Sequence, residues 1–167
     1  CGIIILFEKS LRIGDFVELA DGLLGEVREI NIRSTLLRTL DNADIIVPNA
    51  DFISSQVNNW TLNDDIRRFS ISFSVAYGSD LEQVREAGLK AAEEVPITLK
   101  RENIMPDVLV TELGASGIEC ILTIWAQGEW VKRPGWVKSQ YLTAIYNNLR
   151  TAEIEIPFPQ MDVHMRS

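Results

Sequence analysis

Two cysteines and one histidine are the first side chains in this sequence to consider as nucleophiles or metal ligands. Cys1 and Cys120 lie far apart in the chain, and His164 has no second histidine or nearby cysteine with which to form a ligand set. A metal site needs several such ligands, and a catalytic nucleophile needs a base that activates it. The residue types and their spacing therefore predict no metal site and no catalytic cysteine or histidine.

Two carboxylate pairs and one glycine-containing segment are the other candidates for chemistry. Asp64/Asp65 and Glu93/Glu94 lie in polar stretches, whereas a catalytic pair needs burial to separate its two pKa values. "ELGASG", residues 112–117, stands between two apolar segments, which indicates a hairpin turn rather than a phosphate-binding loop. We therefore expect no enzyme and no cofactor. A buried carboxylate in a closed cleft would favour the alternative, an enzyme with a small-molecule site.

The composition restricts the partners of this chain. Its 24 acidic and 16 basic residues give a formal charge of −8. A surface that binds nucleic acid needs an excess of lysine and arginine, so we expect no nucleic-acid partner. The longest apolar run, "IIILF" at residues 3–7, is far shorter than the roughly 20 residues of a membrane-spanning helix. Because the chain enters this run directly from Cys1, we expect part of a longer protein; a mature lipoprotein is the alternative.

Residues 13–60 have the pattern of short strands separated by tight turns. "FVEL", "EVREINI", "STLLRTL" and "DIIVP" are the strand candidates, and "ADGLLG" and "DNA" supply turn residues between them. These residues show no helical period, so a small barrel or sandwich is predicted. The apolar residues change phase between Val27 and Ile30, which predicts a β-bulge at that point.

After residue 60 the pattern changes. "TLNDD", residues 61–65, is polar and predicts a linker. "RFSISFSVAY" then alternates strictly, which predicts a strand with one apolar face and one solvated serine face. Ser79 and Glu82 match a capping box at the start of an amphipathic helix that ends before Pro96.

Three further strands and a second helix complete this half. "DVLVTELG" and "GIECILTIWAQG" predict a hairpin that turns at "ASG". Apolar residues at helical spacing follow Pro134, and they are Val137, Tyr141, Ala144, Ile145 and Leu149. The closing "MDVHM" predicts a last strand that contains His164. The order β, α, β, β, α, β is that of a ferredoxin-like domain, whose open sheet face we expect to contact another subunit.

The segment before the predicted last strand is stiff. Pro157 and Pro159 fix φ and remove two backbone donors, so "EIPFPQ" must run extended. A domain that ended in this way would present its last strand through a rigid connection.

Five segments in register over nearly the whole chain carry a family resemblance. They are "RIGDFVEL", "GEVREINIRSTLLRTLDNADIIVPN", "SVAYGSDLEQV", "TELGASGIE" and "IPFPQMDVH". Together they resemble the soluble C-terminal portion of the small-conductance mechanosensitive channel (MscS) family. The resemblance implies a small all-β, barrel-like (Sm-like) domain at residues 12–60, a linker at 61–65, and an α+β ferredoxin-like domain at 66–167.

The resemblance also implies two sets of functional residues. "CGIIILF" resembles the end of a pore-lining membrane helix, and residues 1–11 would contain it together with a membrane-face segment. Lys9 and Arg12 lie where the family carries basic residues, which anionic lipid on the cytoplasmic side attracts. The tail residues implied in packing and assembly are Pro157, Phe158, Pro159, Gln160 and Met161.

The function implied by the resemblance is that of a channel vestibule. Seven copies would form a homoheptamer beneath a pore in the inner membrane, on its cytoplasmic side. The channel would open under membrane tension and release ions and small solutes during hypo-osmotic shock, and this portion would assemble the oligomer and filter solutes. The alternative is a soluble protein-interaction module that uses the same domain pair. Upstream spans of about 20 apolar residues would distinguish the channel from that module.

Overall fold

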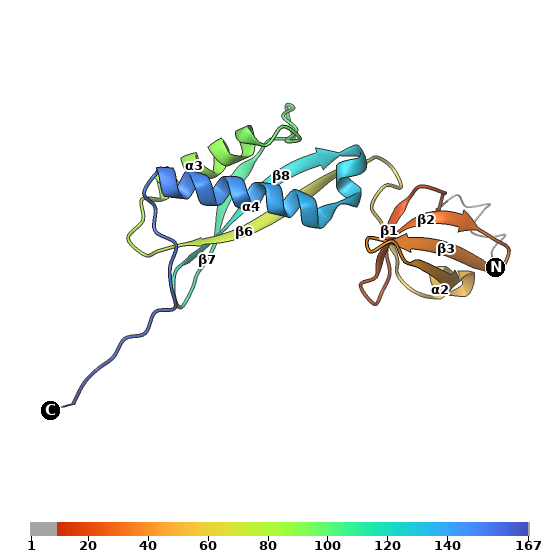
Figure 1. Cartoon of the computed structure of the whole chain (residues 1–167), viewed down its shortest axis with the longest axis horizontal. Helices are drawn as coiled ribbons and strands as arrows, with labels where there is room; N and C mark the ends of the chain where they lie inside the picture. The colour runs from red at the N-terminus through yellow and green to blue at the C-terminus, as the bar shows by residue number, and fades with distance from the viewer. Residues whose placement is uncertain (1–9, 167) are drawn as a thin grey trace. The chain divides into compact units, whose positions relative to one another are not determined.

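The computed structural model of the chain describes residues 10–166, which form two compact units. Of these residues, 10–67 and 131–133 belong to the first unit, and 68–130 and 134–166 to the second. Figure 1 shows a small β-rich unit at the N-terminal end of the chain and a unit with two long helices after it. The segment "CGIIILF" and Lys9 lie outside the described residues.

The first unit is a five-stranded sheet in the order β4-β3-β2-β1-β5, and all its pairings are antiparallel. Its strands are β1 (Phe16–Glu18), β2 (Leu24–Ile30), β3 (Ser34–Thr39), β4 (Asp44–Pro48) and β5 (Asn58–Asn59). Alternate residues point to one face, where Val17, Val27 and Leu37 are fully buried. The register between β2 and β3 shifts between Val27 and Glu29, which confirms the predicted bulge.

One element of the first unit contradicts the prediction that residues 13–60 contain no helix. Helix α2 (Asn49–Ser54) follows β4 directly. Its six residues make fewer than two turns, too few for a helical period to show in the sequence. The helix begins at Asn49, whose buried side chain donates to Asn31 O at 2.8 Å and Ile32 O at 3.2 Å. Asn49 therefore fixes the loop between β2 and β3.

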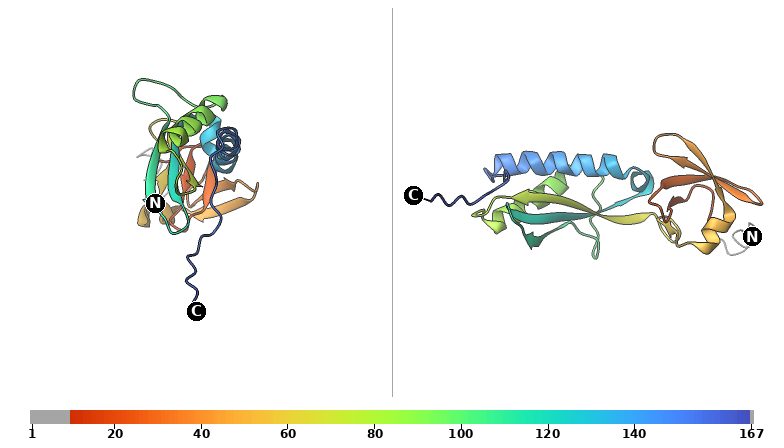
Figure 2. Two further views of the ribbon diagram at one scale, coloured as in Figure 1. Left: turned by 90° about the vertical axis from the view of Figure 1, so that its left-hand side faces the viewer. Right: turned by 90° about the horizontal axis from the view of Figure 1, so that it is seen from below.

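The second unit is a three-stranded sheet in the order β6-β8-β7, covered on one face by two helices (Figures 1 and 2). Its elements are β6 (Ile66–Val75), α3 (Leu81–Glu94), β7 (Asp107–Leu113), β8 (Ile118–Gln127), the 3₁₀ turn η1 (Gly128–Lys132) and α4 (Pro134–Thr151). The first two residues of β6 and the last two of η1 belong to the first unit. The β7–β8 pair is antiparallel and turns through "GASG", as predicted. All five apolar residues expected on α4 are buried.

Two sequence predictions in the second unit need correction. Helix α3 is capped by Asp80, whose carboxylate accepts from the Glu82 amide at 3.0 Å, and not by Ser79, whose hydroxyl donates to Ala76 O. Asp80 is adjacent to the helix and its side chain reaches the same donor, so the sequence pattern matched one residue too early.

The predicted closing strand at "MDVHM" is wrong, because residues 155–166 form no strand and His164 is exposed. Glu155 O accepts from the Ala76 amide at 2.8 Å, beside the end of β6. Pro157 and Pro159 have no N–H to continue such a ladder, and the chain then extends away from the sheet (Figure 1). The described part of the second unit therefore has the order β, α, β, β, α. No helix within residues 10–166 is long and apolar enough to cross a bilayer.

Candidate functional site

The residues first considered for chemistry lie apart from one another. Cys120 is buried in β8, and this burial, with a smaller contribution from Glu119, raises the pKa of its thiol. Both carboxylate pairs are exposed, and the Lys100 ammonium hydrogen-bonds to Glu93 and lowers the pKa of that carboxyl. Among residues 10–166, no group of three potential ligands is placed to hold a metal ion. The two residue sets that the sequence analysis predicted, Arg12 near the start of the described chain and the tail at 157–161, are therefore the places to examine for a candidate site.

Arg12, in the first predicted set, contacts the chain where it leaves the sheet of the first unit. Its guanidinium Nη2 donates to Leu62 O at 2.6 Å and to Thr61 O at 3.3 Å. Its backbone N–H donates to Asp15 Oδ2 at 3.0 Å, and its Nε lies 3.8 Å from the same oxygen. The side chain is 55% exposed, so these contacts hold one face of it while the other faces solvent.

Asp15 is the centre of this cluster and was not predicted from the sequence. It is only 5% exposed, and its carboxylate accepts from Asn59 Nδ2 at 2.8 Å and from Thr61 Oγ1 at 3.0 Å. The Thr61 hydroxyl oxygen in turn accepts from the Phe16 amide at 3.1 Å. The sheet makes this cluster possible, because β1 pairs with β5 and places Val17 opposite Asn59. A buried carboxylate with several donors is well satisfied and resists displacement.

A turn before β1 presents Asp15 to these donors. Gly14 adopts a φ of +95°, a conformation that side-chain-bearing residues rarely adopt, and its amide donates to Val27 O at 2.8 Å. The Asp15 amide donates back to Arg12 O at 3.0 Å. Glycine followed by aspartate is a common turn signal, but the distant partners of the aspartate leave no such signal in the sequence.

An aromatic contact reinforces the same segment. Trp60 lies against Phe16, with ring centroids 5.0 Å apart, and the Arg67 guanidinium carbon lies 3.3 Å from the Trp60 ring centroid. Burial lowers the pKa of Arg67, and the nearby Glu18 charge partly offsets this effect. Residues 59–67 are thus held to the first unit by hydrogen bonds at one end and by stacking at the other.

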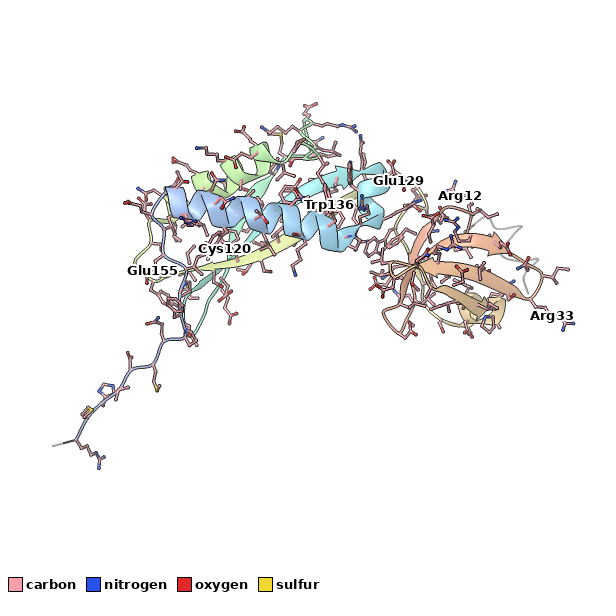
Figure 3. The ribbon with its side chains drawn as sticks, in the orientation of Figure 1. Arg12, Arg33, Cys120, Glu129, Trp136 and Glu155 are labelled. Atoms are coloured by element: carbon pink, nitrogen blue, oxygen red, sulfur yellow. The ribbon has the colours of Figure 1, made fainter. Side chains whose placement is uncertain are left out.

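The predicted tail residues divide into two groups in the structure. Pro157 packs against Gly117 in the β7–β8 turn, where a Cβ on the glycine would lie 2.6 Å from Pro157 Cγ. The backbone amide of Gln160 donates to Ser116 Oγ at 3.1 Å, and the Tyr77 hydroxyl donates to Gly114 O in the same turn. This docking begins just after Glu155, which is labelled where the chain leaves α4 (Figure 3).

The other tail residues project into solvent. Phe158 is 78% exposed and Met161 is 82% exposed, and Pro159 is exposed between them. The tail is therefore fixed to its own unit at Pro157 and Gln160 and presents apolar side chains outward. Such side chains contribute little to the packing of this unit and are available to another surface.

Comparison with known proteins identifies the class. Residues 1–62 match the family described as "Mechanosensitive ion channel, beta-domain", and residues 69–156 match "Mechanosensitive ion channel MscS, C-terminal". The chain therefore belongs to the MscS family of mechanosensitive ion channels.

Particular members of the family resemble the chain over almost its whole length. It is 39% identical over 166 residues to the mechanosensitive channel MscK of Escherichia coli K12, covering 99% of this chain and 14% of MscK. It is 37% identical over 160 residues to an uncharacterized MscS family protein of Archaeoglobus fulgidus, covering 95% of this chain and 54% of that protein. The crystal structure of Helicobacter pylori MscS in its closed state matches with a TM-score of 0.85 and 28% identity, covering 99% of this chain and 63% of that chain.

Proposed function

We propose that this chain forms the cytosolic vestibule portion of a mechanosensitive ion channel. The observation that supports this proposal is the order of the two family matches, which together account for most of the chain. On this proposal the channel opens under membrane tension and releases ions and small solutes during hypo-osmotic shock. The present chain assembles the homoheptamer and filters solutes on the cytoplasmic side of the inner membrane.

The domain division proposed for this function is residues 12–60, a linker at 61–65, and residues 66–167. The five-stranded antiparallel sheet of the first unit supports an Sm-like barrel as its fold. The order β6, α3, β7, β8, α4 supports a ferredoxin-like origin for the second unit, with its fourth strand replaced by the docked tail.

Assembly is the role that we propose for the tail residues. Phe158 and Met161 expose apolar side chains, while Pro157 and Gln160 hold the tail on its own unit. This arrangement fixes the direction in which the exposed residues are presented, which lowers the entropy cost of contact with a neighbouring copy.

The experiment that tests the channel function is patch-clamp recording of the full-length protein under graded suction. Stepwise currents that appear above a threshold of suction, together with a native mass of seven copies, are the expected result. A full-length protein that inserts in the membrane but passes no tension-dependent current would contradict the channel function. A native mass other than seven copies would contradict the heptamer.

A soluble interaction module remains the second candidate. It is favoured by a specific observation, the exposed Leu109, Val110 and Leu113 on the edge strand β7. An edge strand with apolar side chains is a typical place for a partner to bind. The absence of apolar spans of about 20 residues from the full-length sequence would favour this module over the channel.

A further inference from the structure

We propose that Arg12 is a positioning residue that straps the exit of the first unit to its entry, rather than a charge that faces lipid. Here "exit" means Thr61 and Leu62, which follow β5, and "entry" means Arg12 to Asp15, which precede β1. The effect of this strap on gating rests on the proposed channel function, whereas the strap itself can be tested without it.

The Arg12 guanidinium is directed toward two backbone carbonyls of its own unit. Its shortest contact is to Leu62 O, at 2.6 Å, and this carbonyl is 50 residues away in sequence. A second carbonyl, Thr61 O, shares the same Nη2 donor. A guanidinium that binds two successive carbonyls and lies near Asp15 has one face directed at groups of its own unit, which fixes the position of the side chain.

The Asp15 carboxylate is buried among donors that come from different segments of the chain. The carboxylate receives donors from the entry (the Arg12 amide), from the last residue of β5 (Asn59) and from the exit (Thr61). Because Asp15 is almost fully buried, displacing any of these donors would leave a desolvated acceptor, which is costly. Arg12 and Asp15 thus hold the entry and exit segments together from two sides.

The strap begins at residue 10, where the described part of the chain starts. Ser10 also takes part, because its carbonyl accepts from Asn59 Nδ2 at 3.1 Å. Force applied to the chain before residue 10 would therefore reach Asn59 at the end of β5, and Arg12 would pass it on to Thr61 and Leu62. The segment that receives the force leads into β6 at Ile66. The strap thus couples whatever precedes residue 10 to the connection between the two units.

Two substitutions separate the strap from a lipid-facing charge. Arg12→Lys keeps the positive charge but cannot span two carbonyls and Asp15 with a planar fork, whereas Arg12→Gln removes the charge. A lipid-facing role predicts that Arg12→Lys behaves as wild type and that only Arg12→Gln is impaired. The strap predicts that both variants are impaired. Arg33→Gln, which removes an exposed positive charge elsewhere in the first unit (Figure 3), is the matched control.

Hydrogen exchange in the 167-residue chain is the first measurement. The Phe16 amide donates to Thr61 Oγ1 and the Thr61 amide to Asn59 Oδ1, so both amides report on the strap. We expect both Arg12 variants to exchange about tenfold faster at these two amides, the effect of losing a charged hydrogen bond. The Asn49 backbone amide, which donates to Arg33 O at 2.9 Å and has no partner in the strap, tests whether the unit is still folded. Wild-type exchange at Phe16 and Thr61 in Arg12→Lys would overturn the proposal.

Opening pressure in the full-length protein is the second measurement. We expect Arg12→Lys and Arg12→Gln to shift it in the same direction, and Arg33→Gln to leave it unchanged. A shift in Arg12→Gln alone would assign the residue to lipid electrostatics and overturn the strap. If no variant, wild type included, passes current, the channel function fails while the exchange result still decides the strap.

Discussion

Replacement of Gly117 by alanine is the most direct test of how the tail docks on the second unit. An ideal Cβ at this position would lie 2.6 Å from Pro157 Cγ and 2.8 Å from Val75 O. Carbon atoms in contact prefer separations of about 3.5–4.0 Å, and a Cβ 2.8 Å from a carbonyl oxygen is also too close, so both contacts must lengthen. Val75 is the fully buried last residue of β6, so the tail at Pro157 and the β7–β8 turn that carries Gly117 are the parts that give way.

The expected change in the free energy of unfolding of Gly117→Ala follows from two opposing effects. Overpacking a close contact destabilises the folded state by about 1–3 kcal/mol. Alanine also has less backbone freedom than glycine in the unfolded chain, which stabilises the folded state by about 0.4–1 kcal/mol. The two ranges give a net loss between about 0 and 2.6 kcal/mol. Because two contacts are overpacked, we expect Gly117→Ala to lower the free energy of unfolding of the second unit by about 1–2 kcal/mol. The positive-φ glycines of this structure do not include Gly117, so no backbone strain adds to this value.

Denaturant unfolding and hydrogen exchange together measure the effect. The Ala76 amide donates to Glu155 O and the Gln160 amide to Ser116 Oγ, so both should exchange faster in the variant. Gly135→Ala is the matched control, because its Cβ would meet nothing within 4 Å and the residue lies in the first turn of α4. We expect the control to be neutral or stabilised by up to about 1 kcal/mol. Unchanged unfolding of Gly117→Ala, with unchanged exchange at both amides, would refute the docking.

Three further outcomes are expected. Asn49→Ala should lower the unfolding free energy of the first unit by about 1–3 kcal/mol in denaturant titrations, because it leaves the buried Thr35 hydroxyl and two loop carbonyls without their amide partner. Phe158→Ala should leave the melting temperature unchanged, since the side chain is largely exposed, but should reduce the native mass; an unaltered oligomer would count against its assembly role. Cys120 should react with a thiol reagent at pH 8 only after denaturation in a Cys1→Ser chain, because burial raises its pKa and blocks access; rapid labelling of the folded chain would disprove this.

Much of the fold could be predicted from local patterns. The apolar residues of α4 and the bulge in β2 follow from periodicity, which requires only neighbouring residues and a buried face. Helix α2 escaped prediction because six residues are too few to show a period. The last strand was wrongly predicted because "MDVHM" alternates like a strand but has no described partner strand with which to pair.

The candidate site was predicted less completely. Resemblance indicated Arg12 as a membrane-face charge, and the sequence alone gave no sign of its contacts with Thr61 and Leu62. A backbone carbonyl accepts hydrogen bonds whatever its side chain is, so no residue type marks it as a partner. The tail residues were predicted as one group, and burial in the folded chain separates Pro157 from the exposed Phe158.

The sequence by itself determined the parts of this protein that depend on local order: the alternation of β6, the amphipathic α4, the turn at "GASG" and the family to which the chain belongs. Tertiary structure alone decided where Arg12 and Asp15 reach, because their partners lie 44 to 50 residues away and meet them only when β5 pairs with β1. It also decided that the tail docks on the β7–β8 turn rather than joining the sheet. Pro157 cannot donate to a ladder, and only in the folded chain does it meet Gly117, which leaves room for its ring.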